Sequence, residues 1–154
     1  MFWGEHRHQI DEKGRIRIPP DIKAELGDNL LITISAEGCL CIDNYEKGLA
    51  RLRELESRID EFDPDDKYRR ALTIASSMAY QVQPDKTGRF LLKKELIKYA
   101  GIKKNIVTVG GFNRAELWSE EKWDENFKVN SETYANLLRG ATKARTQKSD
   151  DDKK

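Results

Sequence analysis

Polar and apolar residues alternate in the first part of the chain and predict a β-hairpin. The segment Arg15-Ile16-Arg17-Ile18 places apolar side chains at every second position, the period of a strand with one buried face. Residues 6–10 precede it, and the turn between the two segments begins with Asp11 and ends with Gly14. These residues suit a type I turn followed by a glycine in the left-handed region. We therefore expect a hairpin over residues 6–18.

The pattern then changes to that of a helix, a second hairpin and a longer helix. Pro19-Pro20-Asp21 predicts a helix start and Gly27 its end. Segments 30–35 and 39–42 predict the second hairpin, with Gly38 near its turn. The longer helix is indicated by an apolar stripe at helical spacing, which consists of Leu49, Leu52, Leu55 and Ile59.

The same pattern recurs about half a chain later. Residues 84–92 resemble residues 10–18 at an offset of 74, so that Asp85 and Gly88 take the places of Asp11 and Gly14. A short helix again follows and stops at Gly101, and segments 106–109 and 115–118 form the expected later hairpin. Ser119 predicts the start of the closing helix, with two glutamates in its first turn. The chain is thus a duplicated module.

The repeat sets the expected domain organisation. We place the first module at residues 1–62 and the second at 63–142. Two further helices are expected, one from Asp63 to about Ser76 and one starting at Ser131. Residues 143–154 are charged and lack apolar periodicity, which predicts a disordered tail. Each half is too small to bury a large core alone, so we expect an α+β fold in which the two modules interleave their hairpins.

Composition limits the class of protein. The 154 residues are 38% hydrophobic and 36% charged, and no apolar run is long enough for a membrane span. The first residues lack the layout of a signal peptide, so we expect a cytoplasmic protein. Cys39 and Cys41 are interpreted as small apolar strand residues, and we expect neither a metal site nor a cofactor. The net charge of +1 requires any DNA affinity to come from a local patch that an oligomer multiplies.

An Asp-x-x-x-Arg pair occurs in both copies, as Asp11 with Arg15 and Asp85 with Arg89. A turn of this kind folds the carboxylate back towards the arginine, where it could bind turn amides and orient the guanidinium. An oriented guanidinium suits a phosphate or the O6/N7 edge of guanine. The alternative is a structural turn with a surface ion pair, which would also recur in a duplicated module.

Further cations lie near these turns. Lys13 and Lys86 occupy the turns themselves, and alternation places Arg17 on the same strand face as Arg15. The candidate DNA-binding residues are Arg15, Arg89, Lys13, Arg17, Lys86 and Arg7, and the candidate turn residues are Asp11, Gly14, Asp85 and Gly88.

Together with the sequence around them, these motifs make the chain resemble the MraZ family. The resemblance is carried by Met1-Phe2-Trp3-Gly4-Glu5, by residues 10–19, by Gly38-Cys39-Leu40, by the second Asp85-x-x-Gly88-Arg89 and by residues 101–123. It implies a transcriptional regulator related to AbrB-type proteins, with a swapped-hairpin, double-split β-barrel and no enzyme activity. It also implies that Arg15 and Arg89 contact DNA.

The resemblance further implies a homo-oligomeric ring of about eight subunits. Such a ring would bind direct repeats in double-stranded DNA upstream of the division and cell-wall gene cluster, including its own operon, and would associate with the nucleoid. The second copy departs from the family pattern at Pro84, at Thr87 and at Leu92-Lys93. Since proline restricts the backbone, we expect the two turns to contribute unequally, with the first turn the better supported.

Two other functions compete with this interpretation. The chain could be a protein-interaction or scaffold ring that does not bind DNA, with acidic helices facing partners. Less favoured is a metal-dependent enzyme that uses His6 and His8, which share a strand face but lack a third ligand at convincing spacing.

Overall fold

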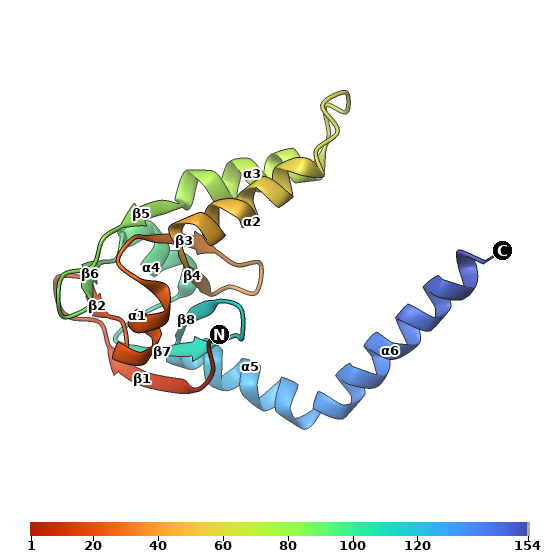
Figure 1. Cartoon of the computed structure of the whole chain (residues 1–154). Coiled ribbons are helices and arrows are strands. Elements are labelled where there is room, and N and C mark those ends of the chain that lie inside the picture. Colours follow the sequence, from red (N-terminus) through yellow and green to blue (C-terminus); the bar gives the residue numbers. More distant parts are fainter. Residues whose placement is uncertain (154) are drawn as a thin grey trace. The chain divides into compact units, whose positions relative to one another are not determined.

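The computed structural model describes residues 1–153, except for the side chains of residues 142–144. Two compact units divide the chain, Met1–Glu120 and the residues from Glu121 onwards, and both predicted modules contribute strands to the first unit. Figure 1 shows the elements in chain order. The strands are β1 (Glu5–Gln9), β2 (Arg15–Arg17), β3 (Leu30–Ile34), β4 (Leu40–Asn44), β5 (Tyr80–Val82), β6 (Arg89–Leu91), β7 (Asn105–Gly110) and β8 (Ala115–Ser119).

The described strands form two antiparallel sheets. The larger has six strands in the order β1-β7-β8-β4-β3-β5, and the smaller pairs β2 with β6. The order is symmetric about the β8–β4 pair, because β1, β3 and β4 occupy places equivalent to those of β5, β7 and β8. Each module therefore lends one strand to the other: β1 pairs with β7, and β5 pairs with β3. The predicted interleaving of the modules is confirmed.

The predicted hairpin over residues 6–18 is wrong in its pairing. The turn is present, since the Gly14 N–H donates to the Asp11 carbonyl and the Asp11 N–H donates to the Arg15 carbonyl. The strands on either side then separate, β1 into the six-stranded sheet and β2 into the ribbon with β6. The same happens around Asp85 in the second module. Pairing across modules satisfies backbone groups that a hairpin within one small module would leave at an open edge. The later hairpins, β3–β4 and β7–β8, are confirmed.

The helices follow the predicted signals with small shifts. Helices α1 (Pro20–Leu26) and α4 (Lys94–Ala100) stop at Gly27 and Gly101 as expected. Helix α2 (Tyr45–Ser57) ends before Ile59, so the predicted apolar stripe is shorter. Helix α3 (Lys67–Met78) starts after Asp66, whose carboxylate accepts from the Arg69 N–H, rather than at Asp63.

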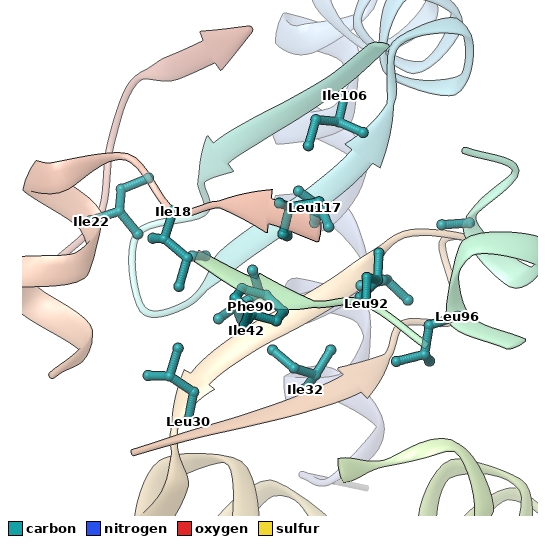
Figure 2. Packing of buried hydrophobic residues seen from close by; sticks show 14 of the residues in the cluster. Ile18, Ile22, Leu30, Ile32, Ile42, Phe90, Leu92, Leu96, Ile106 and Leu117 are labelled. Atoms are coloured by element: carbon teal, nitrogen blue, oxygen red, sulfur yellow. The ribbon is translucent and has the colours of Figure 1, made fainter. Parts of the chain in front are cut away.

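The core lies where the two modules meet. Buried side chains from both copies pack together, and Figure 2 shows Ile18, Ile42, Phe90 and Leu92 among them. Ile16 and Phe90 point inward from the small ribbon and are almost fully buried. Because residues about 74 positions apart share this core, the ribbon is fixed to the body of the first unit. Cys39 and Cys41 are both buried; Cys41 lies on β4 as predicted, whereas Cys39 lies just before this strand.

The second unit is helical. Helix α5 (Glu120–Glu132) begins directly after β8, as Ser119 predicted, but it continues past Ser131. Helix α6 (Tyr134–Asp151) extends through most of the segment predicted as a disordered tail, and Lys154 lies outside the described residues. Within residues 1–153, none of the helices combines the length and hydropathy that crossing a membrane requires.

Candidate nucleic-acid interface

The β2–β6 ribbon brings the two sequence motifs together. Arg15 lies opposite Leu91, Ile16 opposite Phe90, and Arg17 opposite Arg89. Ile16 and Phe90 face the core, so the other four side chains share the outer face and are exposed. Figure 1 shows β2 and β6 side by side at one edge of the first unit. The outer face thus presents three arginines and one leucine on two short strands.

In the first turn, the Asp11 carboxylate organises both backbone and side chain. Its Oδ1 accepts from the N–H groups of Lys13 and Arg15 at 2.9 and 2.8 Å, and its Oδ2 accepts from Arg15 Nε at 2.9 Å. The hydrogen bond from the Arg15 N–H is the main cause that lowers the pKa of Asp11 below its ordinary value. Gly14 has a φ of 83°, a conformation that disfavours other residues. The first-copy prediction of an oriented guanidinium matches this geometry.

The second turn keeps the backbone hydrogen bonds to its aspartate but lacks the ion pair of the first turn. The Asp85 Oδ1 accepts from the N–H of Thr87 at 2.9 Å, from the Thr87 hydroxyl at 2.7 Å and from the Arg89 N–H at 3.0 Å. The pKa of Asp85 is lowered mainly by the hydrogen bond from the Arg89 N–H and, next, by that from the Thr87 hydroxyl. Within the described part of the chain, the Arg89 guanidinium has no hydrogen-bond or ion-pair partner.

Cross-module contacts hold the two turns in place. The Ile18 N–H donates to the Gly88 carbonyl and the Leu92 N–H donates to the Gly14 carbonyl, both at 2.9 Å. A Cβ on Gly88 would lie 3.2 Å from the Ile18 carbonyl oxygen, so this close approach, like its φ of 82°, favours glycine. Arg17 Nε donates to the Thr87 carbonyl at 2.8 Å and ties β2 to the second turn. The motif turns are therefore one rigid surface rather than two independent loops.

This surface is more basic than the chain as a whole. Residues 11–18 and 85–92 together contain five lysines and arginines against three acidic residues, an excess of two positive charges in sixteen residues. Lys13 and Lys86 are exposed in the turns. A two-stranded ribbon has the width that the DNA major groove admits, and guanidinium groups bind both phosphates and guanine edges. The arrangement is thus suited to double-stranded DNA.

Arg7 does not belong to this surface. It lies on β1 in the six-stranded sheet, opposite Val107. Its guanidinium pairs with Glu5 at 2.7 Å and with Glu120 at 3.5 Å. Of the six predicted DNA-binding residues, the structure brings together the other five.

The histidines lie beside Arg7, on the opposite face of β1. His6 Nε2 lies 3.3 Å from an Asp21 carboxylate oxygen, and His8 Nε2 lies 2.7 Å from the Thr108 hydroxyl. Burial, followed by the proximity of His6, lowers the pKa of His8 to about 4. In the described residues no third metal ligand joins His6 and His8.

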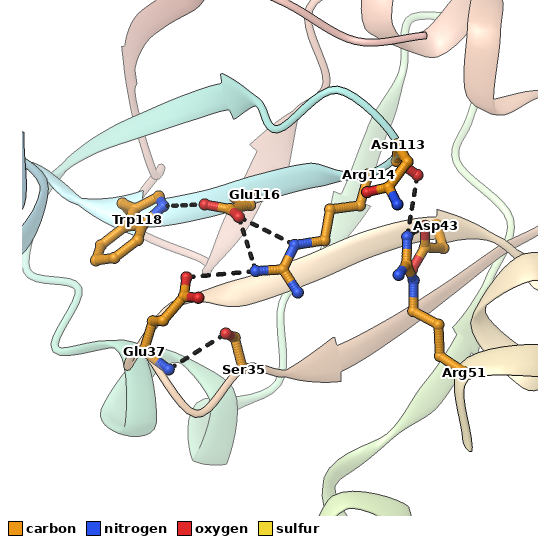
Figure 3. Close-up of polar contacts among 8 residues, drawn as sticks. All are labelled: Ser35, Glu37, Asp43, Arg51, Asn113, Arg114, Glu116 and Trp118. Atoms are coloured by element: carbon orange, nitrogen blue, oxygen red, sulfur yellow. Dashed lines mark hydrogen bonds and ion pairs between the residues drawn. The ribbon is translucent and has the colours of Figure 1, made fainter. Parts of the chain in front are cut away.

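A different cluster joins the loops of the two later hairpins (Figure 3). Ligand atoms of Glu37, Cys39 and Glu116 lie within 4.8 Å of one another. Arg114 occupies the cluster, with its guanidinium 2.8 Å from Glu116 and 3.3 Å from Glu37. Burial raises the pKa of Cys39 to about 12, so the thiol stays protonated at neutral pH. A protonated thiol and carboxylates bound by arginine are poor metal ligands, and we interpret the cluster as structural.

Figure 3 shows a second arginine with a related role. Arg51 pairs with the buried Asp43 at 2.8 Å and donates to the Asn113 carbonyl at 3.0 Å. It thereby links α2 to the β7–β8 loop. These contacts hold the two hairpin ends together at the centre of the sheet and leave the β2–β6 ribbon free of them.

Sequence reasoning missed the residues that support the ribbon from the second module. Tyr80 on β5 donates its hydroxyl to the Leu91 carbonyl at 2.7 Å, and the ammonium of Lys93 lies 4.7 Å from the centre of its ring. Leu91 was also missed as part of the outer face. The repeat contained the signal, because the offset of 74 residues makes Leu91 the counterpart of Arg17.

The chain is similar to known proteins over most of its length. The family described as "MraZ protein, putative antitoxin-like" matches residues 1–69 and 76–143. A "Transcriptional regulator MraZ" of Clostridium acetobutylicum is 40% identical over 126 residues, which cover 81% of this chain and 86% of the relative. The protein of the same name from Lachnoclostridium phytofermentans is 34% identical over 139 residues, which cover 90% of this chain and 95% of the relative.

Proposed function

Since the chain belongs to the MraZ family and is a transcription regulator rather than an enzyme, we propose that it regulates transcription by sequence-specific binding of double-stranded DNA through the β2–β6 ribbon. The observation that carries the proposal is the shared outer face of the ribbon, where Arg15, Arg17 and Arg89 are all exposed. These residues come from two distant segments, and only the pairing across modules brings them together.

The geometry supports direct base reading as well as phosphate contact. The ribbon is attached to the core by Ile16 and Phe90, so its arginines extend from a rigid base. Asp11 orients Arg15 in advance, which lowers the entropy lost on binding. Lys13 and Lys86 in the turns would contact the phosphates that border the groove.

One ribbon offers few cations, so we further propose that binding is multivalent. A homo-oligomeric ring of about eight subunits would present identical ribbons to direct repeats. The proposed targets are repeats upstream of the division and cell-wall gene cluster, including the protein's own operon. With this function, we propose that the protein acts in the cytoplasm, at the nucleoid.

Self-association has a suitable surface on the first unit. A groove of ≈ 510 Å³ runs along α3 and is lined mostly by apolar side chains. Its lining residues include Ile34, Leu55, Ile74 and Tyr99. Exposed apolar surface of this kind is typical of an interface. We propose that the groove receives the C-terminal helices of a second copy.

Charge supports this pairing of surfaces. Helix α3 contains three basic residues and no acidic residue, whereas α5 contains five acidic and two basic residues, a net charge of −3. Exposed apolar side chains lie on α5 and α6, among them Phe127, Tyr134 and Leu137. A contact between two different surfaces of the same chain generates rings when the rotation closes. Ile74→Glu should therefore reduce the mass of the assembly in light scattering, and an unchanged mass would exclude this interface.

We also propose that the observed strand exchange is that of a swapped-hairpin, double-split β-barrel. The exchange of β1 and β5 between modules and the separate β2–β6 ribbon support this fold type. In the described strands the six-stranded sheet remains open at β1 and β5.

Fluorescence anisotropy with DNA from upstream of the protein's own operon tests the function. Arg15→Ala should abolish measurable specific binding while light scattering shows an unchanged assembly. Arg58→Ala is a matched control, because Arg58 also forms an exposed ion pair with a residue four positions away, Glu54, but lies directly after α2, outside the ribbon. Unchanged binding by Arg15→Ala would return the turn to a structural role.

The number of DNA repeats tests multivalency separately. Shortening the DNA from four repeats to one should reduce affinity far more than fourfold, because effective concentration is lost with the linked sites. Equal affinity for the two DNAs would contradict the multivalent mechanism. An intact assembly that binds none of these DNAs would favour the scaffold alternative, which the exposed groove on α3 also fits.

A further inference from the structure

The outer face of the ribbon contains one apolar residue, Leu91, among its basic side chains. Leu91 stands among three arginines and is 57% exposed. Arg15 lies directly opposite on β2, and Arg89 lies two positions earlier on the same strand face. In the first copy the equivalent position is Arg17, so the leucine breaks the symmetry of an otherwise duplicated surface.

The core does not require this side chain. Phe90 and Leu92 on either side are the buried members of their segment. The Leu91 side chain lies near the first turn, since a Cβ built on Gly14 would be 3.6 Å from Leu91 Cδ1. Its backbone is nevertheless fixed by the ladder with β2 and by the Tyr80 hydroxyl. Leu91 is therefore an exposed apolar group held in a defined position beside an oriented arginine.

DNA offers one apolar group in the major groove, the C5-methyl of thymine, and apolar side chains recognise it there. Phosphates and guanine edges would instead favour an arginine at this position. On the basis of the proposed DNA binding, we propose that Leu91 is a specificity-determining residue that contacts a thymine methyl group next to the base read by Arg15. The second copy thereby reads a different base from the first copy.

The test replaces thymine by uracil, which removes only this methyl group. The upstream fragment is amplified with dTTP or with dUTP, and anisotropy titrations measure both affinities for the full-length protein. Wild type should bind the uracil DNA about fourfold more weakly for each methyl contact, the effect of removing one buried methyl-sized group. Leu91→Ala should bind thymine DNA more weakly than wild type and show no preference between the two DNAs.

Two further variants sharpen the result. Leu91→Arg restores the residue of the first copy, so it should lose the thymine preference while its affinity falls more steeply with salt, by about one phosphate contact. Phe62→Ala removes an exposed apolar side chain outside the ribbon and should keep the wild-type preference. Any general effect of uracil on DNA shape acts on all variants alike and cancels in the ratio of preferences.

The failure of this inference can be told from the failure of the proposed function. Wild type that binds both DNAs with equal affinity would overturn the role of Leu91 while DNA binding stands. A full thymine preference in Leu91→Ala would also overturn it, since another group would then read the methyl. Absence of specific binding to either DNA would overturn the proposed function, and the inference with it.

Discussion

The two motif turns have the same backbone hydrogen bonds but differ in the contacts of their arginine side chain. In both, an aspartate accepts backbone N–H groups and a glycine has positive φ. In the first turn Asp11 also binds the Arg15 guanidinium. In the second turn Asp85 accepts from the Thr87 hydroxyl instead, and the Arg89 guanidinium has no hydrogen-bond or ion-pair partner in the described structure. The backbone hydrogen bonds of the turn are therefore the same in both copies, whereas the partner of the arginine side chain differs.

The second difference is the support from the opposite strand. The Arg17 side chain donates to the Thr87 carbonyl and fixes the second turn, whereas the side chain of its counterpart, Leu91, has no hydrogen-bond donor. The first turn thus has an ion pair of its own, and the second turn has instead a hydrogen bond from an arginine of the other module. The comparison shows that the two copies share the hydrogen bonds and glycines that shape the turns, and differ in the side chains on the outer face.

The largest expected effect tests whether the two turns form one surface. Phe90→Ala should lower the free energy of unfolding by about 3–5 kcal/mol, because the buried ring packs under both strands. Denaturant unfolding followed by circular dichroism measures it. Ile16→Ala, on the opposite strand, should cost about 2–5 kcal/mol. A loss below about 1 kcal/mol for Phe90→Ala would show that the ribbon is not part of the cooperative core.

The next effect separates the two arginines. Arg15→Ala should weaken DNA binding more than Arg89→Ala, because only Arg15 is oriented before binding. For Arg89→Ala we expect a loss of about fivefold, the low end of the range for a single base contact. Anisotropy titrations on one DNA fragment compare them. A larger loss for Arg89→Ala would contradict the proposed advantage of the ion pair.

A smaller effect separates the two aspartates. Asp11→Ala should weaken DNA binding as well as stability, since it releases the Arg15 guanidinium and removes an acceptor for two backbone N–H groups. Asp85→Ala should reduce the melting temperature by a similar amount but change DNA affinity less. Calorimetry and anisotropy on the same samples measure both. Equal losses of affinity would mean that Asp11 acts only through the backbone.

The smallest effect is a dependence on pH. Hydrogen bonds lower the pKa of both Asp11 and Asp85 in the folded protein. Their contribution to stability is therefore present above the unfolded pKa, near 3.8, and is lost as the pH falls through the lower folded values. Melting temperatures from pH 5 to pH 2 should fall less steeply for Asp11→Asn and Asp85→Asn than for wild type. Parallel curves would show that neither carboxylate contributes.

The sequence predicted the local structure of the ribbon but not its pairing. Asp11, Gly14 and their repeats identified the turns, because turn chemistry depends on neighbouring residues. The pairing of β2 with β6 depends on contacts between residues about 74 positions apart, and alternation cannot specify which strand is the partner. A local hairpin was therefore expected where the chain exchanges strands.

The candidate site shows the same limit. Arg15, Arg17 and Arg89 were predicted from motif and alternation, and the structure brings them together. Arg7 was included because it is near in sequence, yet β1 carries it into the other sheet and to Glu5 and Glu120. The hydrogen bond from the Tyr80 hydroxyl to the Leu91 carbonyl joins two strands that belong to different sheets, so no local sequence pattern predicts it.

The most direct test of the central claim is photo-crosslinking from the ribbon to DNA. A photoreactive amino acid placed at Lys13 or at Lys86 should crosslink to DNA from upstream of the protein's own operon, and excess unlabelled DNA should compete. The same group at Phe62, which is exposed between α2 and α3, should not crosslink. Crosslinks from Phe62 and none from either turn would contradict the account.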